Sequence, residues 1–144
     1  MKDINNPLIK AYFTALQGNV TNQASAVVEV YEGEEPDDLL ASEYIVITDV
    51  SGSDASTKGN TGHNARVQIT INTWKTKYVN KKELNYIAGQ ILEIIMPTPQ
   101  STLQADGIQI VTTTLDNSTD LDYGVLAARK FISRNLIFSH LINY

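Results

Sequence analysis

The chain has 144 residues, 42% of them hydrophobic and 19% charged, which indicates one folded domain and excludes a disordered chain. It contains no cysteine, which excludes disulfides and thiolate metal sites and is compatible with a reducing cytoplasm. The net charge is −5 and Lys and Arg are thinly scattered, which argues against nucleic-acid binding; no apolar run approaches the roughly 20 residues that cross a membrane.

An amphipathic helix is the first element expected, over residues 7–17. Asn6 can cap this helix, Pro7 suits its first position and Gly18 can end it. Its apolar side chains recur at helical spacing on one side, which predicts that the helix docks on a sheet. These side chains are Leu8, Ile9, Tyr12, Phe13 and Leu16.

Two strands are expected next, separated by an acidic loop. Residues 25–31 are rich in β-branched side chains and predict a strand. Residues 32–38 combine glycine, proline and several carboxylates, so an exposed loop is expected there. Residues 44–48 form a nearly continuous apolar run, which predicts a strand buried on both faces in the middle of a sheet.

A polar segment, residues 51–64, separates that strand from the next one. Its single apolar side chain is Ala55, so burial cannot offset the entropy of ordering the segment, and a long flexible loop is expected. Apolar and polar side chains then alternate over residues 66–74, which is the clearest strand pattern in the chain. The loop is therefore expected to join two antiparallel neighbours as an extended hairpin.

The second predicted helix carries the strongest apolar face. Asn80 followed by Glu83 resembles a capping box, and Pro97 and Pro99 end the helix. The apolar face predicts that this helix packs across the sheet. Its members are Leu84, Ile87, Ile91, Ile94 and Ile95.

The C-terminal third of the chain predicts two further strands. Residues 108–115 include three consecutive threonines and predict a strand, and residues 116–120 read as a turn or loop. Residues 130–142 are ambiguous between helix and strand. Their alternation favours a long final strand, although Arg134 and His140 interrupt the apolar pattern.

Together these elements predict an α+β fold in a single domain that spans residues 1–144. The sheet is expected to have four to five strands and to be mainly antiparallel. The two principal helices are expected on one face of it, with a long polar hairpin loop at residues 51–64.

The sequence offers no recognisable active site. It contains no glycine-rich phosphate loop and no nucleophile elbow. A zinc site needs three or four ligands at defined spacing, which His63 and His140 do not provide, and both histidines are expected at the surface or at a sheet edge. We therefore expect no catalytic residue, no cofactor and no bound metal.

Two acidic clusters leave another interpretation open, a small acidic ligand-binding or calcium-binding domain or an enzyme. One cluster lies within residues 32–38, where a solvated turn is the simpler interpretation. The other alternates as at the start of a calcium loop, but Leu121 stands where glycine is needed and Ala127 where a bidentate Glu is needed. Its members are Asp116, Ser118, Asp120 and Asp122.

The order in which these segments follow one another is also informative. An amphipathic helix at residues 7–17 is followed by residues 30–36, which lead into the strand at 43–47, and then by a strand at 67–74 that ends in tryptophan. This order, completed by the second helix, resembles the tail-completion and tail-terminator family of siphophages and related viruses, which includes the lambda tail terminator. The resemblance covers about residues 7–142.

The resemblance implies a structural virion protein, not an enzyme, that forms a ring, usually a hexamer, at the phage neck. Such a ring caps the tail tube and joins tail to head, so the implied partners are copies of itself, the tail tube protein and the head-completion or connector protein. Genome DNA would pass through the bore without specific binding, and no membrane would be involved. Assembly in the host cytoplasm is implied. The long segment 51–64 and the few basic residues at 126–135 depart from the family and leave a head-side adaptor or closure ring as an alternative.

Subunit contacts are expected through the polar loop and through exposed aromatic residues. The loop carries Lys58 and His63 and is followed by Arg66; we expect these residues to contact a neighbouring subunit or the adjoining ring. Tyrosine and tryptophan are enriched at binding hot spots, so Trp74 and Tyr78 are further candidates. A cluster at the edge of the core is the alternative interpretation of these two aromatics.

Overall fold

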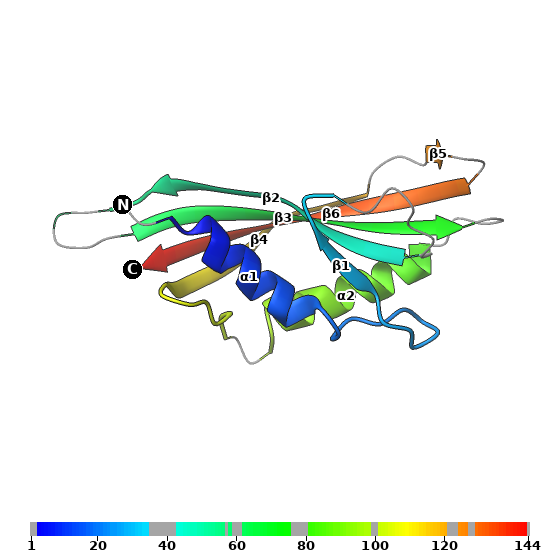
Figure 1. The fold of residues 1–144 in the computed structure, drawn as a ribbon, viewed down its shortest axis with the longest axis horizontal. Helices are drawn as coiled ribbons and strands as arrows, with labels where there is room; N and C mark the ends of the chain where they lie inside the picture. The colour runs from blue at the N-terminus through cyan, green and yellow to red at the C-terminus, as the bar shows by residue number, and fades with distance from the viewer. Residues whose placement is uncertain are drawn as a thin grey trace.

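The computed structural model describes residues 3–34, 43–56, 58, 62–75, 81–98, 101–120, 124–126 and 129–143 (Figure 1). In this part of the chain, one helix precedes three strands and a second helix precedes three more. The elements are α1 (Asn5–Leu16), β1 (Glu29–Glu32), β2 (Glu43–Asp54), β3 (Gly62–Lys75), α2 (Lys81–Ile95), β4 (Gln109–Asp120), β5 (Gly124–Leu126) and β6 (Arg129–Asn143).

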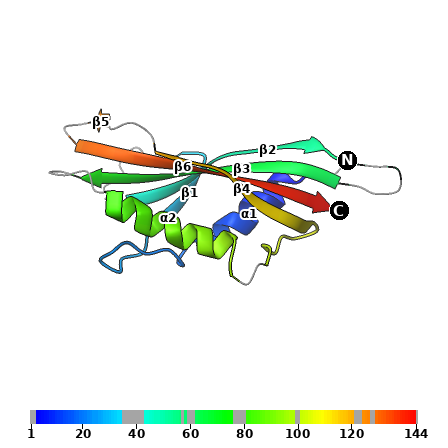
Figure 2. The same cartoon turned by 180° about the vertical axis from the view of Figure 1, so that it is seen from behind.

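The strands form one sheet in the order β1-β2-β3-β6-β4, with the short β5 beside β6. Strands β1 and β2 are parallel, and the other pairs are antiparallel. Both helices lie side by side on the same face of the sheet (Figures 1 and 2). The predicted α+β class, with a mainly antiparallel sheet and two helices on one face, is confirmed; β5 was not expected from the sequence.

Strand β3 realises the alternation predicted for residues 66–74. Val67, Ile69 and Ile71 are fully buried on the face that carries the helices, which we call the helix face. Gln68 and Thr70 are half-buried and point to the opposite face, the open face. Strand β3 pairs with β6 in continuous register and with β2 apart from one irregularity between Ile47 and Asp49, so this division extends to both neighbours.

The core lies between the helix face and the two helices. The second helix contributes its predicted apolar residues, although Ile94 is only half-buried. The first helix contributes Leu8, Tyr12 and Leu16, while Phe13 is 40% exposed and faces away from the core. Apolar side chains of α2 without any exposed surface are Leu84, Ile87, Ile91 and Ile95.

The flexible loop expected at residues 51–64 is wrong in its extent. Strand β2 continues to Asp54 and β3 begins at Gly62, with Asp54 opposite His63 in an antiparallel register. The Ala55 amide donates to the Gly62 carbonyl at 2.9 Å and continues the ladder beyond the two strands. These polar residues form strands because the backbone ladder supplies the pairing that their side chains do not. The expected antiparallel hairpin is present.

The turn expected at residues 116–120 is also wrong, because β4 continues through Asp120 opposite Arg134 of β6. Two irregularities, between Ile110 and Thr112 and between Leu115 and Asn117, interrupt its pairing with β6. The final segment is a strand, as alternation favoured. The side chains in the second half of β4 are exposed on both faces. Because they are polar, the sequence shows no alternation there from which a strand could be predicted.

The beginning of α1 and the bounds of β1 differ from the predicted ones. The helix begins at Asn5, so Asn6 does not cap it, and the Asp3 carboxylate accepts a hydrogen bond from the Asn5 amide at 3.0 Å. Strand β1 covers Glu29–Glu32 rather than residues 25–31, because Ser25 adopts a left-handed φ of 65° within a turn. The end of α1 is as predicted, with φ of +80° at Gly18.

Glu83 has a different role from the one expected in a capping box at the start of α2. Its side chain is buried, and Oε1 accepts a hydrogen bond from the Gln23 amide at 2.7 Å. Glu83 therefore holds the loop that precedes β1 against the helix. Asn80, its expected partner, lies outside the described residues.

Candidate interaction surfaces

Three of the expected contact residues lie at one end of the sheet. We call this the hairpin end: residues 51–54 of β2, residues 62–66 of β3, and Ala55, Ser56 and Lys58 between them. Lys58 is exposed there. His63 is buried on the helix face, whereas Arg66, three positions later, is exposed on the open face. The expectation of a surface histidine is therefore wrong for His63, because its position in β3 turns it toward the core.

Arg66 belongs to a polar group that crosses three strands. Its guanidinium lies 3.5 Å from the Asp116 carboxylate of β4, and the Ser139 hydroxyl of β6 donates to the same carboxylate. An exposed ion pair of this kind contributes at most about 1 kcal/mol to folding. Asp116 is thus engaged by a cation and a hydroxyl from neighbouring strands, which does not support the calcium-loop interpretation.

Of the two aromatic candidates, Trp74 lies far from the hairpin end. Trp74 is opposite Phe131 in the β3–β6 register, and eight strand residues, or roughly 26 Å, separate it from Arg66. Tyr78 falls outside the described residues. The proposed contact residues therefore do not form one patch, and contact through Trp74 and Tyr78 stays a prediction.

The open face carries hydroxyl and amide side chains in the half of β3 that is remote from the hairpin end. Thr70 donates to the Asn135 side chain at 2.8 Å, and Ser133 donates to the Asn72 side chain. These bonds link β3 to β6 across the sheet. The surface is polar but nearly uncharged, apart from pairs such as Arg66 with Asp116.

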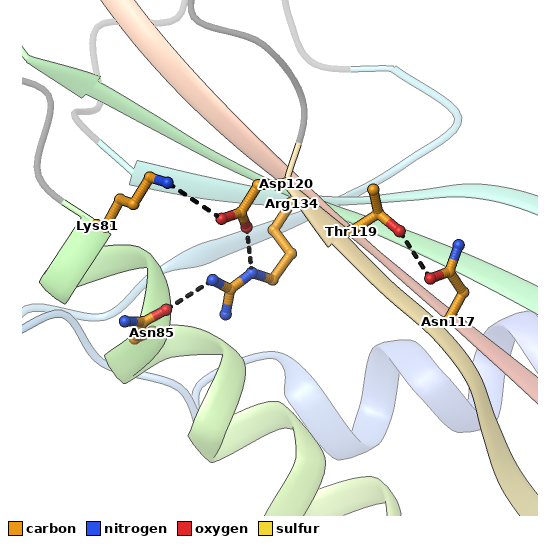
Figure 3. Close-up of polar contacts among 6 residues, drawn as sticks. All are labelled: Lys81, Asn85, Asn117, Thr119, Asp120 and Arg134. Atoms are coloured by element: carbon orange, nitrogen blue, oxygen red, sulfur yellow. Dashed lines mark hydrogen bonds and ion pairs between the residues drawn. The ribbon is translucent and has the colours of Figure 1, made fainter.

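A charged cluster joins α2 to the sheet at the other end of β6 (Figure 3). The Arg134 Nε donates to Asp120 Oδ1 at 2.6 Å, and a terminal nitrogen of Arg134 donates to Asn85 Oδ1 at 2.6 Å. Lys81 Nζ lies 3.7 Å from the second oxygen of Asp120. The hydrogen bond from Arg134 holds the pKa of Asp120 below its usual value. The cluster ties β4, β6 and α2 together, and the pairing of Asp120 with two cations does not support the calcium-loop interpretation.

A buried hydrogen-bonded group lies under α1 on the helix face. Tyr12 Oη and His140 Nε2 are 2.5 Å apart, and His140 Nδ1 lies 2.9 Å from Thr113 Oγ1. Burial lowers the pKa of His140 to about 4 and raises that of Tyr12. A neutral imidazole can accept from Tyr12 and donate to Thr113, so the three side chains satisfy one another. The expected edge position of His140 is therefore wrong.

A shallow groove runs between the N-terminus of α1 and the hairpin end. Asp3, Asn5, Asp54 and His63 are among its lining residues. Within the described part of the chain, no group of three or more His, Asp or Glu is placed to hold a metal ion. The groove therefore lacks the converging ligands that a metal centre requires.

In the described ranges, neither helix is long and apolar enough to span a membrane. No protein-family model matches the sequence, and no curated protein matches it. A chain in the solved structure of the virion of a native gene transfer agent particle has a similar fold. The TM-score is 0.78, the match covers 100% of both chains, and 17% of the residues are identical. At this identity the likeness establishes a shared fold.

The buried group around His140 and the charged cluster around Arg134 differ in how well the sequence predicts them. His140 lies in the even-numbered series of Ile132, Leu136, Phe138 and Ile142, so the alternation of β6 places it on the helix face. The sequence gives no comparable signal for Arg134 and Asp120, because their contact depends on β4 continuing beyond residue 115.

Proposed function

We propose that this chain is a structural protein of a phage-like virion and that it acts through contacts with other proteins rather than by catalysis. The observation that carries this proposal is the agreement of its fold with a chain of a gene transfer agent virion. The agreement extends over the full length of both chains, so it concerns the whole fold described above and not one part of it.

Within the virion, we propose a tail terminator at the neck: a closed ring of six copies that caps the tail tube and joins it to the head. The resemblance of residues 7–142 to the tail-terminator family supports this position. The partners are then other copies of the chain, the tail tube protein and the head-completion or connector protein. A ring needs two different surfaces on each subunit, one for each neighbour.

The charge of the subunit fits a ring through which DNA passes. Six copies at −5 carry about −30, a field that repels the phosphate backbone. Two arginines of the sheet strands lie near carboxylates, Arg66 near Asp116 and Arg134 beside Asp120, so the charge of these two is locally balanced. These features favour passage of the genome without binding.

The hairpin end is the surface proposed to contact a neighbouring subunit or the adjoining ring. Residues 51–54 and Lys58 are exposed. Their polar side chains are accessible and can form hydrogen bonds with a neighbouring chain. Of the original candidates, Lys58 and Arg66 are exposed enough to take part directly.

A shortened hairpin tests this proposal in cells that produce the particles. Replacing residues 56–61 by Asn-Gly suits the hydrogen bond between Ala55 and Gly62, which can close a two-residue turn. We expect the purified variant to keep its stability within about 1 kcal/mol. In the producing cells we expect free heads and free tails in electron micrographs instead of joined particles. Lys10→Ala, on the exposed side of α1, is the control and should leave joining intact.

Two outcomes of this experiment would count against the proposal at different levels. Normal joining by the shortened hairpin would refute a contact through residues 56–61, which include Lys58. Normal joined particles from cells that lack the entire chain would refute the role in the neck.

A further inference from the structure

The sheet has an open edge at β4. In the described residues, β4 pairs with β6 on one side, and no strand pairs with its other side. Its sequence contains neither lysine nor proline, the residues that commonly blunt such edges. Between its two irregularities, Thr112–Leu115 pairs regularly with β6 and offers a straight edge of four residues.

The opposite side of the sheet has a second open edge, at the hairpin end. Strand β1 pairs with β2 only from Tyr44 to Ile47. Beyond the irregularity at Thr48, residues 49–54 of β2 pair with β3, and no described strand pairs with their outer side. The molecule therefore carries two different edges, as head-to-tail association requires.

The two open edges lie at the same position along the strand direction, on opposite sides of the sheet. Following the register across β3 and β6, Ser53 is level with Thr112, and Val50 is level with Leu115. A neighbour related by rotation about an axis roughly parallel to the strands would therefore bring residues 50–53 against Thr112–Leu115. Both stretches are regular over these four residues.

Strand directions favour this pairing. From β2 through β3 and β6 to β4, each strand is antiparallel to the one before it. Because the direction reverses three times from β2 to β4, β4 runs in the opposite direction to β2. When a neighbouring copy keeps the same orientation, its β2 therefore lies antiparallel to β4, which is the more stable arrangement.

Side-chain faces also agree across the boundary. Ser53 and Thr112 both lie on the open face, while Val50 and Leu115 both lie on the helix face and are only half-buried against the core. Pairing would bring these two aliphatic side chains together and complete their burial. Val111, 41% exposed at the start of β4, would lie beside the added strand.

We propose that copies of this chain join edge to edge, with residues 50–53 of β2 in one copy paired antiparallel with Thr112–Leu115 of β4 in the next. This inference rests on the proposed ring and specifies its subunit contact. Repeated around the ring, the contact gives one continuous sheet with the helices of every subunit on the same side.

The natural absence of cysteine allows a direct cross-linking test. Cysteine pairs at Ser53 with Thr112 and at Ser51 with Thr114 place both thiols on the open face at facing positions, where disulfide geometry is attainable. The crossed pairs, Ser53 with Thr114 and Ser51 with Thr112, cover a shift of two residues. The control pair combines Ser53→Cys with Thr14→Cys, an exposed threonine on α1.

Each variant is first checked for an unchanged melting temperature, and then oxidised with copper phenanthroline and separated without reductant. We expect a ladder of covalent oligomers beyond the dimer for at least one facing or crossed pair, and its loss on reduction. The control pair and the single variants should stay predominantly monomeric.

Three results would overturn the edge-to-edge contact. Rings that form without any ladder would refute the contact and leave the neck role standing. Dimers from Thr112→Cys or Thr114→Cys alone, without higher bands from the pairs, would show that two β4 edges meet instead. A monomer that never cross-links would also refute it, because both edges are complete in a single chain.

Discussion

The middle of the sheet and its hairpin end are built from the same strands but obey different physical constraints. In the middle, helices cover Ile45, Ile69 and Leu136, which have no exposed surface. At the hairpin end, residues 51–54 of the same β2 strand are exposed on both faces. The comparison indicates that the buried side chains in the middle of the sheet supply most of the stability. Residues 51–54 are held mainly by backbone pairing with β3, so their side chains and outer edge are available for contacts.

The largest expected difference between the two regions is in stability after truncation of a side chain. Ile69→Ala removes a fully buried side chain from β3 and should lower the free energy of unfolding by about 2–5 kcal/mol. Ser53→Ala at the hairpin end should change it by less than about 0.5 kcal/mol. Urea unfolding measures both. If both variants lose the same free energy of unfolding, the middle of the sheet does not contribute more to stability than the hairpin end.

The second prediction concerns the border between the regions, where Tyr12 of α1 meets His140. The pKa of His140 is about 4 in the folded chain and about 6.5 when unfolded, so between these values only the unfolded chain binds the proton. Stability should therefore fall as the pH is lowered from 6.5 to 4, with up to about 3 kcal/mol from this residue. Urea unfolding at stepped pH should show a shallower fall for His140→Gln. Parallel curves for the two proteins would exclude this linkage.

A smaller effect is expected at the other end of the sheet, where Arg134 ties β6 to β4 and α2. Arg134→Ala breaks two hydrogen bonds at 2.6 Å and should lower the free energy of unfolding by about 1–2 kcal/mol. Lys81→Ala, its matched control, removes an exposed cation 3.7 Å from the same Asp120 and should cost less than about 0.5 kcal/mol. If the two variants are equally stable, the cluster does not tether α2.

The comparison also explains which parts of the fold can be predicted from the sequence. Elements with one buried face, β3 and α2, show the period of their structure, because burial selects apolar residues at every second or every third to fourth position. Residues 51–54 of β2 and the second half of β4 are exposed on both faces, so no apolar pattern forms there. Their strands arise from pairing with β3 and β6, a tertiary effect that local composition does not carry.

The candidate contact residues divide in the same way. The exposure of Lys58 follows from its polar surroundings, and that of Arg66 follows from the alternation of β3. The burial of His63 does not, because it depends on β3 beginning at Gly62 rather than after a long loop. The two open edges cannot be predicted from the sequence, because they depend on the order of the strands in the sheet. In that order β4 lies beside β6 and not beside β3.

The mass and shape of the purified chain test the central claim most directly. Light scattering combined with negative-stain electron microscopy should find closed rings of six copies, about 95 kDa from subunits of 15.9 kDa. A particle of 15.9 kDa that stays monomeric at high concentration would contradict self-assembly through these surfaces.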